Sequence, residues 1–340
     1  MILYIGNILS SSGMNPPPVE LIRNEIYKSS KIKMITASNK KNRILRFLHM
    51  NYVYWGNYKR VSLMFIDVYS TKAFYFTFYF ALISKILSLK YIPIIHGGNI
   101  GIRIKKNKLM TKFIFNNSDI NISPSRYIYN ILKDNNFSVK YIPNCINFSL
   151  YKFKKRQKIR PRIIWLRSFH EIYNPNMAIN VFKIIKSLYR KTKLTMIGPD
   201  KDGSLNHCQQ LSKKYRIDHN IDFLGYLSKT EWIKIARDHD IFINTSKIDN
   251  MPVSVIEMMA LGLPIVSTDV GGIPFILEHG KNSLLVKNND AQNMASQIKY
   301  LIDKPYFASQ ISMRAFEDSK SFSTDLVIPE WSKIINQYSR

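Results

Sequence analysis

Cysteine is scarce in this sequence, with only Cys145 and Cys208 among 340 residues. The two lie far apart and show no metal-ligand spacing, which excludes a disulfide framework and a cysteine-based metal cluster. We therefore expect the protein to work in a reducing compartment. The opening residues, MILYIGN, carry no basic segment and predict a first strand instead of a signal peptide.

Long apolar runs are also lacking. The longest, Ala73 to Ser84, has 12 residues and is followed by Lys85. Because a membrane-spanning helix needs roughly 20 apolar residues, we expect this segment to form a buried or interfacial helix.

Acidic residues are few: 23 Asp and Glu stand against 50 Lys and Arg, for a formal net charge of +27. Residues 1–150 hold 21 basic and 5 acidic side chains, and the remainder holds 29 and 18. A surface with this excess of positive charge attracts an anionic partner, either nucleic acid or the anionic face of a membrane. No recognition helix, zinc spacing or RNA-binding aromatic signature is present, which leaves nucleic-acid binding as a remote alternative. AT-rich codon usage is a further explanation of the many lysines.

Short apolar strands alternate with helical segments, a pattern typical of parallel α/β sheets. The first half has expected strands at residues 2–6, 33–38, 61–67, 91–97, 119–123 and 139–143. A basic connector follows at 151–162, and the pattern restarts at 162–167, 193–198, 221–225, 240–244 and 264–268. Two such series predict two doubly wound, Rossmann-like domains facing a cleft, over residues 1–152 and 160–322.

The most informative stretch is DNMPVSVIE, from Asp249 to Glu257, which follows an apolar strand. Pro252 suits the first position of a helix, where its missing N–H costs nothing, and Glu257 lies about one turn further on. Two carboxylates are thus expected beside the free N–H groups of a helix N-terminus, which attracts phosphate. A site whose backbone amides bind phosphate and whose carboxylates bind sugar hydroxyls suits a sugar nucleotide. The alternative is an ordinary βα unit with two solvated acids.

At these residues the chain resembles the retaining glycosyltransferases of family 4, which have the GT-B fold. Their signature is Glu, seven residues and Glu, followed by a small-residue helix that ends in Gly-x-Pro. Here it reads D-NMPVSVI-E-MMALGLP, with Asp249 one methylene shorter than the usual Glu. The resemblance covers essentially the whole chain and is strongest between Ile221 and Val286. It implies that the last helix, within residues 323–340, packs back on the N-terminal domain.

The resemblance implies roles for the matching residues. Glu257 would bind the ribose hydroxyls, Asp249 the hexose, and Arg167 the diphosphate. His96, at a strand end before two glycines, would touch the donor hexose, although a lone His is more often structural. The nucleotide site would also include Asn250, Met251, Pro252, Val253, Gly198, Gly225 and Tyr226. The family's second diphosphate cation, a Lys, is replaced by Ile172, and His170 or Lys201 are candidates to supply the charge.

The resulting hypothesis is a metal-independent retaining glycosyltransferase with no cofactor. It would move a hexose-type sugar from a UDP- or GDP-linked donor to a glycan or lipid-linked acceptor in surface polysaccharide or lipopolysaccharide biosynthesis. The N-terminal half would bind the acceptor, and its basic surface with the aromatic segment Ala73 to Leu89 would hold the enzyme at the cytoplasmic face of the cell membrane. A sugar-nucleotide epimerase of the same fold is the main alternative, and it would need an acid/base pair around one sugar.

Overall fold

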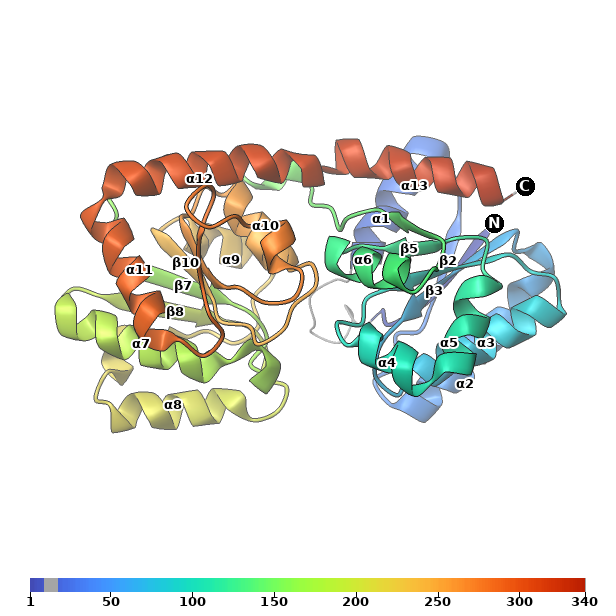
Figure 1. The fold of residues 1–340 in the computed structure, drawn as a ribbon, viewed down its shortest axis with the longest axis horizontal. Helices are drawn as coiled ribbons and strands as arrows, with labels where there is room; N and C mark the ends of the chain where they lie inside the picture. The colour runs from blue at the N-terminus through green and yellow to red at the C-terminus, as the bar shows by residue number, and fades with distance from the viewer. Residues whose placement is uncertain (9–17, 340) are drawn as a thin grey trace. The chain divides into compact units, whose positions relative to one another are not determined.

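The structure is a computed structural model that describes residues 1–8 and 18–339. The chain divides into two compact units (Figure 1). Unit 1 comprises Met1–Cys145 and the segment from Thr324 onward, and unit 2 comprises Ile146–Ser323.

Unit 1 is built on a parallel six-stranded sheet with the order β2-β1-β3-β4-β5-β6. Its strands are β1 (Ile2–Ile5), β2 (Met34–Ala37), β3 (Leu63–Val68), β4 (Tyr91–Ile95), β5 (Asn121–Ser123) and β6 (Val139–Tyr141). Its helices are α1 (Pro18–Ser30), α2 (Arg43–Asn57), α3 (Phe74–Ile86), α4 (Ile100–Lys106), α5 (Lys108–Asn116), α6 (Arg126–Asp134) and α13 (Thr324–Tyr338). The strand order reverses between β1 and β3.

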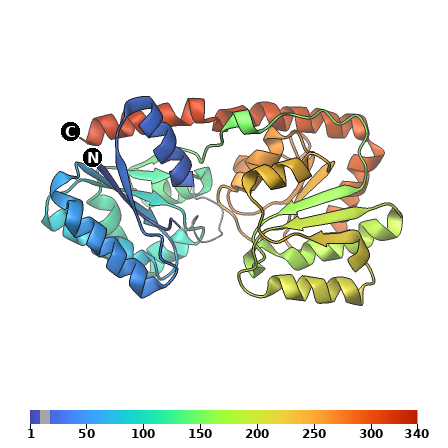
Figure 2. The ribbon, with the colours of Figure 1, turned by 180° about the vertical axis from the view of Figure 1, so that it is seen from behind.

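Helices cover both faces of this sheet, as the burial of its strands requires. Every side chain of β3 is buried. Helices α1 and α13 cover one face, where Ile26 and Trp331 share an apolar cluster with Phe65 of β3. Figures 1 and 2 show α1 in blue and α13 in red side by side. Helices α2 to α6 cover the opposite face.

The apolar segment at residues 73–84 forms most of α3, and its Phe74, Phe80 and Ala81 are fully buried in the core of unit 1. It is therefore mainly a core helix. In the ranges that the structure describes, none of the helices has the length and apolar character needed to cross a membrane.

Unit 2 has a second parallel six-stranded sheet, with the order β12-β11-β10-β7-β8-β9. Its strands are β7 (Arg162–Leu166), β8 (Lys193–Ile197), β9 (Ile221–Phe223), β10 (Ile241–Asn244), β11 (Ile265–Thr268) and β12 (Leu284–Val286). Its helices are α7 (Pro175–Leu188), α8 (Ser204–Lys214), α9 (Lys229–Ala236), α10 (Val253–Ala260), α11 (Ala291–Asp303) and α12 (Pro305–Ser319). This is the strand order of a dinucleotide-binding Rossmann sheet, which reverses between β7 and β10.

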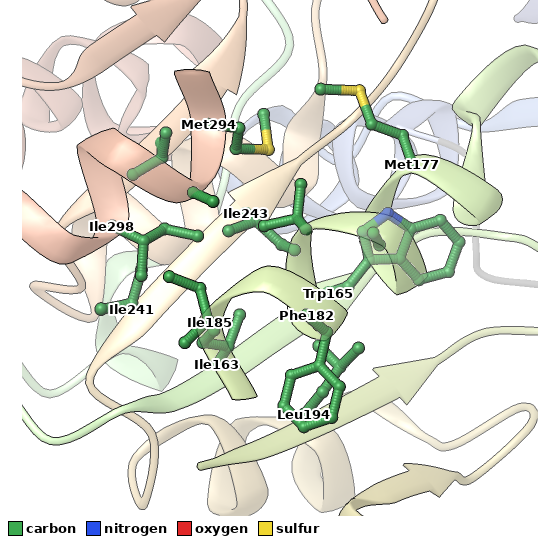
Figure 3. Close-up of a cluster of buried hydrophobic side chains, with 14 of the residues drawn as sticks. Ile163, Trp165, Met177, Phe182, Ile185, Leu194, Ile241, Ile243, Met294 and Ile298 are labelled. Atoms are coloured by element: carbon green, nitrogen blue, oxygen red, sulfur yellow. The ribbon is translucent and has the colours of Figure 1, made fainter. Parts of the chain in front are cut away.

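The core of unit 2 lies between this sheet and helices α7 and α11. Figure 3 shows Trp165, Ile163 and Ile243 of the sheet beneath Phe182 and Ile185 of α7. Met294 and Ile298 of α11 close the cluster. This packing fixes the strands whose carboxyl ends carry the candidate site.

All eleven strands that the sequence predicts are present, and the predicted fold class, two doubly wound Rossmann-like units, is confirmed. The sequence analysis missed β12, a three-residue strand at the sheet edge. Its shortness leaves too few residues for a periodic signal.

The expected basic connector is packed against unit 2 by the buried side chain of Arg156. Its Nε donates to the carbonyl of His239 at 2.9 Å, and its terminal nitrogen donates to the carbonyl of Gly262 at 2.7 Å. Burial lowers the pKa of Arg156 to about 10, while nearby Asp240 opposes the shift. One guanidinium thus satisfies the carbonyl of Gly262, which follows α10, and the carbonyl of His239, which precedes β10.

We predict that Arg156→Ala destabilises unit 2, because it leaves these carbonyls buried without their donor and removes one of the two arginines beside the Asp240 carboxylate. The free energy of unfolding in urea should fall by roughly 3 kcal/mol. Arg314→Ala is the matched control, since Arg314 forms an exposed ion pair with Asp318 worth at most about 1 kcal/mol. Equal losses in the two variants would show that Arg156 does not hold the connector.

Candidate functional site

The candidate site of unit 2 lies where the strand order reverses. Strands β7 and β10 are neighbours, and the chain leaves their carboxyl ends in opposite directions. Open α/β sheets bind ligands at such switch points. Arg167 directly follows β7, and Asp249 lies in the loop between β10 and α10.

Arg167 and Asp249 form an ion pair between a terminal guanidinium nitrogen and Oδ2. Both side chains are largely buried, and the guanidinium stacks over the Tyr173 ring at 4.7 Å. Burial lowers the pKa of Arg167, and the opposing charges of Tyr173 and Glu257 pull it back up. The site is thus a buried cation held in place by a carboxylate and an aromatic ring.

Helix α10 begins at Val253, directly after this loop. Pro252 is the residue that precedes the helix, one position earlier than the sequence analysis placed it. The first turn leaves the N–H groups of Val253 and Ser254 without an intrahelical acceptor. Within residues 1–8 and 18–339, the buried atoms Arg167 Nε and Ser254 Oγ make no hydrogen bond. Buried polar atoms are normally satisfied, and these two lie beside the start of α10.

The loop residues between Asp249 and the helix shape this N-terminus. Asp249 Oδ1 accepts a hydrogen bond from the Asn250 N–H at 2.9 Å, and Met251 is buried in the apolar cluster beneath α10. The carbonyl of Asp249 accepts from the Gly272 N–H at 2.7 Å. Gly272 therefore braces the loop through its backbone N–H.

Glu257 lies one turn into α10 and is almost fully buried. Its Oε1 accepts hydrogen bonds from the Tyr151 hydroxyl and from Lys229 Nζ, both at 2.7 Å. Burial, followed by the charge of Glu257, raises the pKa of Tyr151. In the part of the chain that the structure describes, both of these hydrogen bonds go to Oε1.

Gly198 and Gly225 align the neighbouring strand ends with Arg167. The Arg167 N–H donates to Ile197 O at 3.0 Å, and the Gly198 N–H donates to Gly225 O at 2.7 Å. A Cβ at Gly198 would overlap the carbonyl oxygen of Arg167. Tyr226, which follows Gly225, is 41% exposed and therefore accessible to a ligand.

The structure offers a cation beside Ile172 that the sequence analysis missed. The N–H of Lys247 donates to the carbonyl of Ile172 at 2.8 Å, and its Nζ lies 2.9 Å from Glu171 Oε1. His170, a candidate from the sequence, instead accepts the Ile172 N–H through Nδ1 at 3.1 Å.

Lys229, Tyr151 and Lys247 were all missed for the same reason. Each contacts a residue that is distant in the sequence. Lys229 and Tyr151 are 28 and 106 positions from Glu257, and Lys247 is 76 positions from Glu171. No local sequence pattern predicts contacts between residues so far apart in the chain.

In unit 1, His96 lies at the carboxyl end of β4, beside the reversal between β1 and β3. Its Nε2 lies 3.0 Å from Asp67 Oδ1, and its ring stacks on Tyr69 at 5.6 Å. The Tyr69 hydroxyl donates to Asp67 Oδ2 at 3.0 Å, and the Tyr4 hydroxyl also donates to this carboxylate. Asp67 is the lone acid in an apolar strand, a signal that the sequence analysis did not use.

The Gly6 and Asn7 turn after β1 belongs to the same cluster. Asn7 N–H donates to Asp67 Oδ2 at 3.4 Å, and Arg46 donates to the Asn7 side-chain oxygen at 2.9 Å. A Cβ at Gly6 would overlap the Asp67 carboxylate. A buried acid with His96, two tyrosines and an arginine around it thus forms a polar site at the carboxyl ends of the interior strands β1, β3 and β4.

Neither the cysteines nor the Asp pairs of the sequence provide a reactive centre. Cys145 and Cys208 are free and buried, and burial raises both thiol pKa values to about 12. Two Asp-x-Asp stretches occur, at 200–202 and 238–240. Asp240 pairs with Arg160, and Asp202 accepts the Glu171 N–H at 2.8 Å. No group of three metal-ligating residues is present in the part of the chain that the structure describes.

We predict that Gly198→Ala is far more damaging than Gly203→Ala. Both glycines have positive φ angles, +150° and +86°, but a Cβ at Gly203 meets no atom within 4 Å. Gly198→Ala should lower the free energy of unfolding by about 1–3 kcal/mol more than the control, because the new methyl group displaces the Arg167 backbone. Urea unfolding measures the difference. Equal losses would mean that only the φ angle matters and that β8 does not position Arg167.

Known proteins resemble this chain in both sequence and fold. The family model for glycosyl transferases group 1 matches residues 150–318. An uncharacterized glycosyltransferase of Haemophilus influenzae is 24% identical over 158 residues, which are 46% of this chain and 44% of the relative. WcaL of Salmonella typhimurium, a putative colanic acid biosynthesis glycosyltransferase, is 34% identical over 94 residues, which are 26% and 23% of the two chains. This chain thus spans less than half the length of these two curated relatives.

The crystal structure of Anabaena Alr3699/HepE in complex with UDP superposes on the whole chain. Its TM-score is 0.78 at 15% identity, with 99% of each chain covered. At this identity the likeness shows the fold, whereas the family model matches residues within unit 2 and spans nearly all of it. Unit 2 therefore belongs to the glycosyl transferases group 1, and the chain as a whole has the GT-B fold.

Proposed function

We propose that the protein is a retaining, metal-independent glycosyltransferase that takes its sugar from a nucleoside-diphosphate donor. The observation that carries the proposal is the buried Arg167–Asp249 pair at the N-terminus of α10, with Glu257 one turn further on. It combines a cation, free N–H groups and two carboxylates at one switch point. This is the chemistry that a sugar diphosphate with hydroxyls on both sides requires.

The diphosphate would bind Arg167 and the first turn of α10. Helix N-termini bind phosphate through their free N–H groups and the helix dipole. Arg167 Nε and Ser254 Oγ, buried and without hydrogen bonds in the described chain, would donate to the phosphate oxygens. Lys247, beside Ile172, is our candidate for a second cation once the diphosphate competes with Glu171 for it.

The carboxylates would hold the two sugars of the donor. Glu257 Oε2 would accept a ribose hydroxyl, while Oε1 keeps Tyr151 and Lys229. Asp249 would accept a hexose hydroxyl with lone pairs that its contacts to Arg167 and Asn250 leave unused. Asn250, Met251, Pro252 and Val253 then form the wall of the site, and Gly198, Gly225 and Tyr226 lie at the nucleotide side.

Catalysis would rest on position and electrostatics. When the bond between the sugar and the diphosphate breaks, negative charge grows on the leaving phosphate. Arg167 and the N-terminus of α10 would stabilise that charge, because both are already oriented by the buried pair. The acceptor would be a glycan or lipid-linked sugar of surface polysaccharide biosynthesis, bound by unit 1 with His96 in its site. The colanic acid assignment of WcaL supports this acceptor class.

We further propose that the enzyme works at the cytoplasmic face of the membrane, where lipid-linked acceptors are found. The +27 charge supports this location through attraction to anionic lipids. Incubation with donor alone distinguishes the epimerase alternative, since an epimerase would change the sugar nucleotide in the absence of any acceptor.

The first test is thermal stabilisation by a panel of nucleoside diphosphates. A true donor base should raise the melting temperature at concentrations above its dissociation constant, and UDP is the first candidate. If no nucleoside diphosphate of the panel stabilises the protein, the nucleotide-sugar assignment of unit 2 is wrong.

Glu257→Gln should weaken binding of the stabilising nucleotide by roughly 1.5–3 kcal/mol, because a charge-assisted bond to ribose is lost. Calorimetry with the 2′-deoxy and 3′-deoxy nucleotides separates this effect from general damage. The wild type should prefer the ribonucleotide over at least one deoxy form, and Glu257→Gln should lose that preference. A preference that survives the substitution would remove Glu257 from the ribose.

Arg167→Ala should lower turnover at saturating donor by on the order of a hundredfold or more, since the leaving diphosphate loses its buried cation. Arg314→Ala, which removes an exposed arginine of the same unit, should leave turnover unchanged. Wild-type turnover in Arg167→Ala would assign the charge to another group, and Lys247→Ala would then be measured.

A further inference from the structure

Helix α2 of unit 1 has an apolar face that points to solvent. Ile44, Leu48, Tyr52 and Trp55 are 72%, 57%, 79% and 47% exposed. Their spacing of four, four and three residues places them on one stripe of the helix, and Leu45 widens it. The outward face of a helix in a water-soluble protein is normally polar.

The exposed stripe is separate from the face of α2 that packs against the core. Met50 and Tyr54 are buried against the sheet, and the Tyr54 hydroxyl bonds the Ser84 hydroxyl of α3 at 3.2 Å. The helix is thus apolar on two sides, and folding of unit 1 uses only one of them. Contiguous exposed apolar surface of this kind marks an interaction site.

Helix α3 extends the patch. It lies beside α2 (Figure 1). The two helices pack through Phe47 of α2, whose ring lies 5.0 Å from both Phe76 and Tyr79 of α3. Tyr75, Leu82 and Ile86 of α3 are exposed, and they recur at helical spacing. The sequence analysis placed the membrane contact on residues 73–89, but most aromatic side chains there face the core, and α2 carries the larger exposed share.

The surroundings of the patch are basic. Residues 26–118 contain 17 Lys and Arg and a single acid, Asp67. Asp67 is buried in the polar cluster with His96 and is therefore not on the surface. Lys41 and Lys59, both exposed, flank α2 in the sequence, one before its first residue and one after its last.

We propose that the outward faces of α2 and α3 dock unit 1 on an anionic lipid bilayer, with α2 lying in the interface. Helices that bind membranes in this way combine an apolar face with flanking lysines and arginines, and Tyr and Trp favour the headgroup level. A second copy of the chain fits the surface less well, since two strongly basic faces repel. Nucleic acid fits it less well because the stripe itself holds no Lys or Arg to bind phosphate. The inference rests on the proposed function only for the location of the acceptor.

The test uses the triple variant Ile44→Gln, Leu48→Gln, Tyr52→Gln, in which Gln preserves helix propensity. The matched control is Leu188→Gln, Tyr306→Gln, Leu326→Gln, at positions 52%, 77% and 60% exposed and outside the patch. Sedimentation with phosphatidylglycerol-containing vesicles should show binding of the wild type and control that weakens as salt rises. The α2 variant should bind at least about tenfold more weakly, with its nucleotide-induced thermal shift unchanged.

Trp55 gives an independent readout in the unmodified protein. The other three tryptophans, Trp165, Trp232 and Trp331, are buried, so lipid contact can quench only Trp55 directly. Vesicles with brominated acyl chains should quench part of the fluorescence, and non-brominated vesicles should not.

Four results would overturn the proposal: no binding of the wild type to anionic vesicles, equal binding of both triple variants, bound protein without bromine quenching, or a dimer that the α2 substitutions dissolve. The nucleotide shift is recorded on the same samples, so a failure of docking and a failure of the donor site appear separately.

Discussion

The candidate site depends on one interaction, the buried ion pair between Arg167 and Asp249. Burial of a guanidinium is unfavourable unless a partner compensates it, and here the burial is reflected in a lowered pKa. The carboxylate that compensates it comes from the loop that starts α10, so the pair ties the end of β7 to a helix N-terminus. Gly198 allows the neighbouring strand end to approach the Arg167 backbone, and Gly272 braces the Asp249 loop. The remaining site residues take their places from this link.

The two units repeat one physical layout with different chemistry. Each has a parallel sheet whose strand order reverses, and each places a carboxylate beside the reversal. In unit 2 the carboxylate holds a permanent cation, which suits a diphosphate. In unit 1 Asp67 holds His96 among tyrosine hydroxyls, which suits a ligand rich in hydroxyls. The same unit carries the exposed apolar stripe of α2, on the layer of helices opposite α1 and α13.

Strand periodicity was sufficient to predict the fold, whereas Arg167, Asp249 and Glu257 were predicted as members of one site from the resemblance to a known family. Buried parallel strands are recognisable in the sequence as short apolar runs. The carboxyl ends of all strands in a parallel sheet lie at the same end of that sheet. The partners Tyr151 and Lys229 could not be predicted, because they reach Glu257 from distant segments. The stripe of α2 is periodic in the sequence, but inward and outward apolar residues have the same period. Only their exposure in the structure separates the core face from the outward face.

The most direct test is a crystal structure of the protein with the nucleoside diphosphate that stabilises it. We expect the phosphates to contact the Arg167 guanidinium and the N–H groups at the start of α10, with a ribose hydroxyl within hydrogen-bond distance of Glu257. A nucleotide bound away from α10, with the Arg167–Asp249 pair and the Glu257 contacts unchanged, would contradict the assignment of unit 2 as the donor site.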